Sequence, residues 1–267
     1  MVGAKGQRPG SVKTDMKSLS IGAAWLESSV FLKREMGLLL PVVLLFIGVP
    51  FALLLGAIPQ EFRTMAEGGA IPQNVTVPGL SLIAFLLCPL VMIGGTLATY
   101  ALALQPGISL REALGLGFRR IPVALGAAVL VGLVLIVPSM AARMASPQGG
   151  SLVMMIFLFW LSARLLPLNA LVVDRPVGVI AALRESWALS RGMLLRLLAF
   201  LIVISIPLMI VQTVGQILFG LVGVAIGGQE GGRQLGDVGS ALALALGQMV
   251  MIVMTANIYR QMVAGRS

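Results

Sequence analysis

Six long, nearly uncharged apolar stretches run through this chain, and they constrain its fold more than any other feature. Each stretch can form a helix of about 20 residues, the length that crosses the roughly 30 Å hydrocarbon core of a bilayer. Their apolar residues are continuous rather than alternating, which favours helices over a transmembrane barrel. The sequence therefore predicts spans at residues 37–58, 80–104, 121–142, 151–173, 194–222 and 240–262.

The composition agrees with a membrane location and limits the chemistry. Hydrophobic residues make up 58% of the chain and charged residues 11%, against about 45–50% and about 25% in soluble domains. Histidine is absent and Cys88 is the single cysteine. An intrachain disulfide, a Cys/His metal site and histidine-dependent catalysis are therefore excluded. We expect no catalytic residue, no metal and no cofactor.

The distribution of positive charge predicts the orientation. Fifteen of the nineteen lysine and arginine residues lie before the first span, in or at the edge of every second loop after it, or at the end of the last span and beyond it. Such a bias marks the cytoplasmic side, so both termini are predicted to be cytoplasmic. The net charge of +9 then follows from orientation rather than from nucleic-acid binding. Residues 1–18 are predicted to form a disordered basic tail, and residues 19–267 a single six-span membrane domain.

Three segments on the cytoplasmic side, residues 18–34, 109–120 and 176–191, are too charged to span but carry apolar residues on one face. This pattern predicts amphipathic helices that lie in the membrane interface. Ser109 and Glu112 form a capping box at the start of the second, and Asp174 is predicted to cap the third. Each segment precedes a pair of spans. The predicted fold is therefore all-α, with three repeats of an interfacial helix and a helical hairpin.

One part of the chain resembles a known family. The residues that carry the resemblance are Arg164, Pro167, Asp174, Leu183, Ser186, Trp187, Arg191 and Gly192. They are similar to the signature of a bacterial membrane domain that is fused to some glycerophosphoryl diester phosphodiesterases and also occurs alone. Asp174 stands where that family usually has glutamate. The resemblance implies a six-span architecture and an association with membrane lipid. It does not imply enzymatic activity, because the soluble phosphodiesterase barrel is not part of this sequence.

Arg164 is the most unusual candidate site residue, because it lies well inside the span at 151–173. A charge at that depth is costly unless it meets a partner or water. Arg164 could line a pocket for a lipid phosphate or an anionic solute. Alternatively, Pro167 ends the helix early and the side chain extends to the inner surface.

Further candidates lie around that span. Four residues are predicted either to contact anionic headgroups of the cytoplasmic leaflet or only to anchor the topology: Arg184, Trp187, Arg191 and Arg196. In the last two spans, Gln212, Gln216 and Gln248 could line a polar path or make interhelical hydrogen bonds, with Gln212 expected near Gln248. Small residues at 94, 95, 98, 223 and 227 predict close helix packing.

These patterns predict a non-enzymatic, multi-pass protein of the bacterial inner membrane with a structural or lipid- and envelope-associated role. Its expected partners are membrane lipids, not nucleic acid. A small transporter or permease component is the alternative; Arg164 and the glutamines favour it, whereas a three-part repeat does not. A membrane-embedded lipid-modifying enzyme is a second alternative. Acidic residues remain for it, but Glu61, Glu67, Glu230 and Asp237 lie in predicted outer loops and have no evident partner base or metal ligands.

Overall fold

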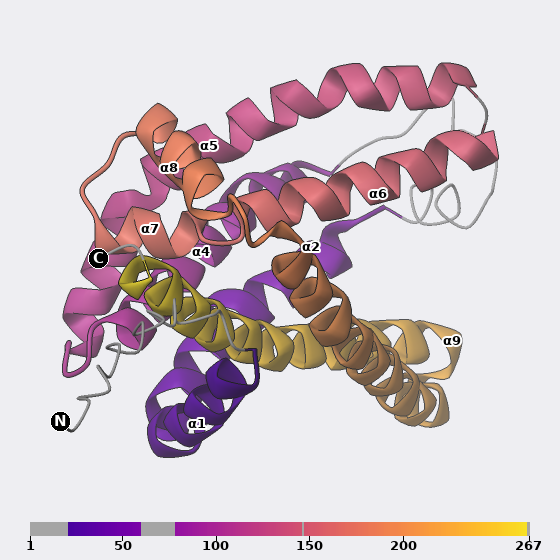
Figure 1. Cartoon of the computed structure of the whole chain (residues 1–267). Helices are drawn as coiled ribbons and strands as arrows, with labels where there is room; N and C mark the ends of the chain where they lie inside the picture. Colours follow the sequence, from indigo (N-terminus) through magenta and orange to yellow (C-terminus); the bar gives the residue numbers. More distant parts are fainter. Residues whose placement is uncertain (1–20, 60–77, 146, 266–267) are drawn as a thin grey trace, which may run out of the picture.

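The computed structural model describes residues 21–59, 78–145 and 147–265, and every regular element among them is helical. The predicted tail at 1–18 lies outside these residues. Five helical segments are long and apolar enough to cross a bilayer, so the chain has the architecture of an all-α, multi-pass membrane protein (Figure 1). The elements are α1 (Ile21–Val43), η1 (Leu44–Gly48), α2 (Val49–Ala57), α4 (Gly79–Leu104), α5 (Leu110–Ala145), α6 (Pro147–Leu165), α7 (Leu168–Asp174), α8 (Val179–Leu189) and α9 (Leu194–Ala264).

The first amphipathic segment is not a separate element. Residues 21–57 form one helical segment, in which a wider π-helical turn, η1, joins α1 to α2. Pro50 lies in the first turn of α2, and a proline cannot donate the hydrogen bond that a regular helix needs there. The wider turn accommodates that missing donor without ending the helix. The amphipathic part therefore continues directly into the first predicted span.

The second amphipathic segment also continues into a span. Its capping box is confirmed: the amide of Ser109 donates to the Glu112 carboxylate at 3.0 Å, and the amide of Glu112 donates to Ser109 Oγ at 3.3 Å. From this start α5 runs past Pro122 and Pro138 as far as Ala145. Each proline removes one backbone hydrogen bond but leaves the neighbouring ones in place.

Only the third amphipathic segment forms a separate helix, α8. The prediction that Asp174 caps it is wrong, because α8 begins at Val179 after Gly178 and has no side-chain cap. Asp174 is the last residue of α7 and accepts a hydrogen bond from the Tyr259 hydroxyl at 2.7 Å. After α8, Gly192 has a φ of +80°, a conformation that favours glycine, and the chain turns there into α9.

The 71-residue α9 is two helices joined by a sharp turn. Gly227 and Gly228 have non-helical backbone angles, and Gly228 has a φ of +65°. The predicted outer loop between residues 222 and 240 is therefore wrong, because both helices continue into it and the turn needs only these two glycines. Figure 1 shows the second half of α9 running back along the first.

Glycines set the close contact between the two halves of α9. A Cβ atom built on Gly239 would lie 2.4 Å from the Gly215 carbonyl oxygen, and one on Gly223 would lie 2.2 Å from that of Gly231. Only glycine fits where two helix backbones come this close. The predicted packing role is confirmed for Gly223, whereas Gly227 belongs to the turn and has open space around its Cβ position.

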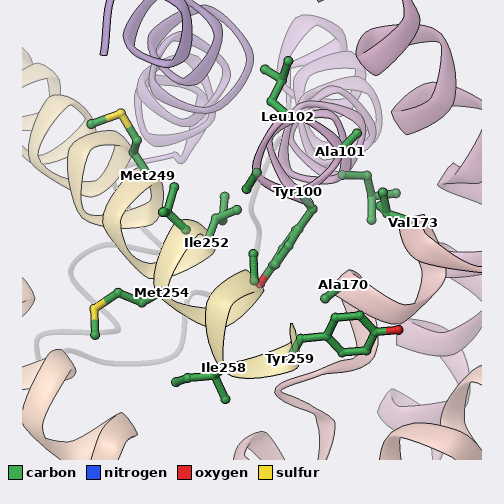
Figure 2. Packing of buried hydrophobic residues seen from close by; sticks show 14 of the residues in the cluster. Tyr100, Ala101, Leu102, Ala170, Val173, Met249, Ile252, Met254, Ile258 and Tyr259 are labelled. Carbon is green, nitrogen blue, oxygen red and sulfur yellow. The ribbon is translucent and has the colours of Figure 1, made fainter. Parts of the chain in front are cut away.

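The buried core lies where α1, α4, α7 and the second half of α9 meet. Figure 2 shows Tyr100 of α4 reaching toward α9, and Tyr259 of α9 beside Ala170 of α7. The small residues predicted in the second span allow α4 to pack closely. A Cβ on Gly95 would lie 2.3 Å from the Phe46 Cβ, and Gly94 lies beneath the Phe118 ring. Ala98 is fully buried.

The glycine contact in α9 gives a first prediction. Gly239→Ala should destabilise the folded protein by about 1–3 kcal/mol, because the added methyl meets a backbone oxygen that cannot move away alone. Gly132→Ala is the matched control, since a Cβ at Gly132 meets nothing within 4 Å. The free energy of unfolding in mixed detergent micelles measures both. Equal stability of the two variants would contradict the close contact.

Candidate lipid-binding site at Arg164

An interruption between helices α6 and α7 places Arg164 at a helix end. The predicted span at 151–173 is interrupted after Leu165, and Pro167 precedes α7 with a φ of −77° and a ψ of −3°. Arg164 therefore lies in the last turn of α6, where the negative end of the helix dipole favours a cation. The Arg164 carbonyl, left free near this helix end, accepts a hydrogen bond of 3.0 Å from the buried Ser186 hydroxyl of α8.

Two tryptophan rings flank the Arg164 side chain. Its guanidinium carbon lies 5.8 Å from the centre of the Trp160 ring and 5.0 Å from that of Trp187. The two rings meet edge to face with their centres 5.3 Å apart. Both distances from the cation are within the range of an attractive cation–π contact. The aromatic faces thus hold the charge in place without using its hydrogen-bond donors.

Two nitrogens of the Arg164 guanidinium are without a hydrogen-bond acceptor in the part of the chain that the structure describes. The Nε and Nη1 atoms of Arg164 are buried and have no hydrogen-bond partner among the described residues. A guanidinium stays protonated in proteins and carries five N–H donors. Leaving such donors buried and unpaired costs free energy. An acceptor that is not part of the described protein atoms, such as a phosphate oxygen, would remove this cost.

An apolar pocket adjoins the tryptophans. It has a volume of about 340 Å³ and lies between α5, α6 and α8, with a lining that includes Leu130, Val134, Leu161, Leu165, Leu183 and Trp187. Leu161 and Leu165 flank Arg164 in sequence on α6, and Trp187 contacts its guanidinium. Val134 and the further lining residue Ile180 are 61% and 70% exposed, so the pocket opens onto the surface. Arg164 is not itself a lining residue, and Trp187 connects its guanidinium to this apolar groove.

Polar contacts fix α8 over this pocket. Arg175, in the loop before α8, lies 3.4 Å from the Glu185 carboxylate and 3.7 Å from that of Asp174. The Tyr259 hydroxyl also donates to the Asp174 carboxylate, which connects the end of α9 to the end of α7. These ion pairs are partly exposed and individually weak. Together with the Ser186 bond they connect α8 to α6 and α7.

The structure does not gather all predicted headgroup residues at the pocket. Trp187 lies against Arg164, whereas Arg184 on α8, Arg191 after α8 and Arg196 in the first turns of α9 are exposed. An exposed arginine can meet a headgroup at the membrane surface, but these three do not enclose a ligand by themselves.

The structure also does not bring the three glutamines together. Gln212 Nε2 donates to Ser240 Oγ at 3.0 Å, and Gln216 is exposed one turn further along the same helix. In the opposite helix, a Cβ on Gly247 would meet the Leu208 side chain at 2.8 Å. Gln248 follows Gly247 and is eight residues beyond Ser240, or about 12 Å along the helix axis. Since Gln212 bonds Ser240, the expectation that Gln212 is near Gln248 is wrong.

The sequence analysis missed three contacts that the structure shows. Trp160 lies one helical turn before Arg164, and this i, i+4 spacing is a visible signal. Ser186 gave no signal of its role, because its partner is a backbone carbonyl on another helix. Arg260 Nη2 donates to the carbonyls of Ala103 and Leu104, both at 2.9 Å, and so satisfies the end of α4.

Comparisons of the chain with protein-family models, with curated proteins and with solved structures find no match. Among residues 21–59, 78–145 and 147–265, no group of three or more Cys, Asp or Glu side chains is placed to hold a metal ion. The candidate site therefore stands on its own geometry, and the resemblance described above remains a prediction.

The hydrogen bond between Tyr259 of α9 and Asp174 of α7 gives a second prediction. Tyr259→Phe and Asp174→Ala should each lower the free energy of unfolding by about 0.5–2 kcal/mol, since each removes the hydrogen bond between the Tyr259 hydroxyl and the partly exposed Asp174 carboxylate. The double variant should cost less than the sum of the two, because both remove one interaction. Unfolding of the four proteins in the same micelles gives the coupling energy. Strict additivity would show that the two side chains do not interact.

Proposed function

We propose that this protein is a non-enzymatic, six-span protein of the bacterial inner membrane that binds an anionic phospholipid of the cytoplasmic leaflet at Arg164. The observation that supports the proposal is the pair of buried, unpaired guanidinium nitrogens of Arg164, whose side chain contacts Trp187 in the lining of an open apolar pocket. A phosphate oxygen accepts hydrogen bonds from the guanidinium, and charge-assisted bonds of this kind are the strong ones. One acyl chain of the same lipid then lies along α5, α6 and α8.

The pocket favours a lipid over a small water-soluble anion. A hydrophilic solute gains nothing from leucine, isoleucine and valine side chains, whereas an acyl chain buries apolar surface against them. This argument also supports the role in lipid or envelope organisation over that of a transporter, because the glutamines that suggested a polar path do not converge. The likeness of residues 164–192 to a lipid-associated membrane domain agrees with this proposal.

Six crossings and a cytoplasmic location of the site follow from the same proposal. Each half of α9 exceeds 30 residues, or about 50 Å of helix, which is enough to cross the hydrocarbon core once. The turn at Gly227 and Gly228 then faces the outer side. The arginine-rich segment from Arg175 to Arg196 faces the cytoplasm, as the distribution of positive charge requires. In this arrangement α8 lies in the cytoplasmic interface and covers the acyl pocket.

Native mass spectrometry of the full chain, purified in gentle detergent, tests the lipid proposal. Arg164→Leu should reduce the retained anionic phospholipid about tenfold, because the cation that pairs with the phosphate is lost. Arg164→Lys should retain an intermediate amount, since a point charge replaces the planar group. Arg119→Leu is the matched control, because Arg119 is an exposed arginine on α5 away from the pocket lining.

The result has a clear contrary outcome. If Arg164→Leu and the wild-type protein retain the same anionic lipids in the same amounts, the site does not bind them. If Arg119→Leu loses lipid to the same extent as Arg164→Leu, retention depends only on net charge, and the pocket is not a specific site.

A further inference from the structure

Another cavity, of about 520 Å³, lies between the first part of α1 and the end of α9. Its lining combines opposite charges with apolar side chains: Glu27, Val30, Phe31 and Arg34 from α1, and Asn257 and Arg260 from α9. The Arg164 pocket, in contrast, is lined by apolar residues of α5, α6 and α8. The two cavities share no residue, so their ligands can be considered separately.

The α1 side of this cavity has an ordered charge pattern. Glu27, Phe31 and Arg34 are spaced four and three residues apart, so they follow one face of the helix. The carboxylate and the guanidinium therefore stand at the two ends of a strip of Val30 and Phe31, about 10 Å apart along the axis. Arg34 also lies over the Phe31 ring at 5.8 Å and pairs with Glu35 at 2.8 Å.

The α9 side of the cavity is held in place. Arg260 Nη2 bonds the carbonyls of Ala103 and Leu104, which fixes the guanidinium beside the end of α4. Asn257 is 6% exposed, and its Nδ2 donates to the buried Ser28 hydroxyl of α1 at 2.8 Å. This bond joins α9 to α1 next to the cavity. The α9 side of the site is therefore preformed, which lowers the cost of ordering that side around a ligand, whereas Glu27 and Arg34 on α1 are exposed side chains.

The charges select the ligand. Two guanidinium groups suit a phosphate, and one carboxylate suits an ammonium group that can donate hydrogen bonds. A free phosphate or a purely anionic headgroup would bring no positive charge to the Glu27 carboxylate in the lining. A free zwitterion would not use Val30, Phe31 and the exposed lining residue Leu26. We propose that this cavity binds a phospholipid with a zwitterionic, primary-ammonium headgroup of the phosphatidylethanolamine type.

In this arrangement the phosphate lies toward Arg34 and Arg260, and the ammonium group toward Glu27. The glycerol and the first part of the acyl chains lie on Leu26 and Val30. The proposal rests on residues outside the Arg164 site and does not depend on lipid binding there.

The test uses the full-length protein and native mass spectrometry with phosphatidylethanolamine, phosphatidylglycerol and phosphatidylcholine of identical acyl chains. Glu27→Gln should lower the retained ratio of phosphatidylethanolamine to phosphatidylglycerol about three- to tenfold, because the ammonium group loses its charged partner. Glu27→Asp, which keeps the negative charge, should retain most of the wild-type ratio. Lys33→Gln, an exposed charge change on the same helix, should leave the ratio unchanged.

Two results would overturn the proposal. One is an unchanged ratio in Glu27→Gln. The other is equal retention of phosphatidylcholine and phosphatidylethanolamine by the wild-type protein, because a quaternary ammonium group cannot donate a hydrogen bond to Glu27. Arg164→Leu should lower the retained phosphatidylglycerol and leave the retained phosphatidylethanolamine unchanged, whereas Glu27→Gln should lower the retained phosphatidylethanolamine. A failure of this site and a failure of the Arg164 site therefore give different patterns.

Discussion

The need to satisfy backbone hydrogen bonds where no water is present governs this structure. Inside a bilayer, each unpaired amide or carbonyl costs several kcal/mol, so the chain must stay helical or find a partner at every interruption. The interruptions here have such partners. Ser186 bonds the carbonyl of Arg164 beside the break at Pro167, and Arg260 bonds the last carbonyls of α4. A wider helical turn precedes Pro50.

Both candidate lipid sites form at such interruptions. The break after Leu165 places Arg164 at a helix end and lets α8 pack beside it, so the cation meets two tryptophans and an apolar pocket. At the other cavity, the arginine that closes the end of α4 also contributes a guanidinium to the lining. Groups that complete the backbone hydrogen bonding thus also create the polar positions that a lipid headgroup can use.

Hydropathy and spacing predicted the helical class, the position of each apolar segment, the capping box at Ser109 and the packing role of Gly95 and Gly223. They did not predict where helices continue. The segment between residues 222 and 240 contains charged residues, but Glu230 and Arg233 pair across one helical turn and remain within the helix. Hydropathy measures transfer into lipid, whereas helix continuity also depends on such local pairs.

The tertiary partners of polar residues were the least predictable part of the site. Asp174 stands at a position typical of a helix cap, but it accepts a hydrogen bond from Tyr259, 85 residues away. Gln212 bonds Ser240 because glycine contacts set the register of the two α9 helices, and no local pattern contains that register. Arg164, in contrast, was visible as a candidate because its charge conflicts with its surroundings, and the structure adds the tryptophans and the pocket.

The central claim is that α9 crosses the membrane twice, so that the Gly227 turn and the C-terminal end lie on opposite sides. Single cysteines placed by Gly227→Cys or Ser267→Cys, in a Cys88→Ala background, can be treated in intact cells with a membrane-impermeant maleimide. Gly227 suits the label because its Cβ position is open. The account predicts labelling of the first cysteine in intact cells, and of the second only after permeabilisation. Labelling of both from the same side would contradict it.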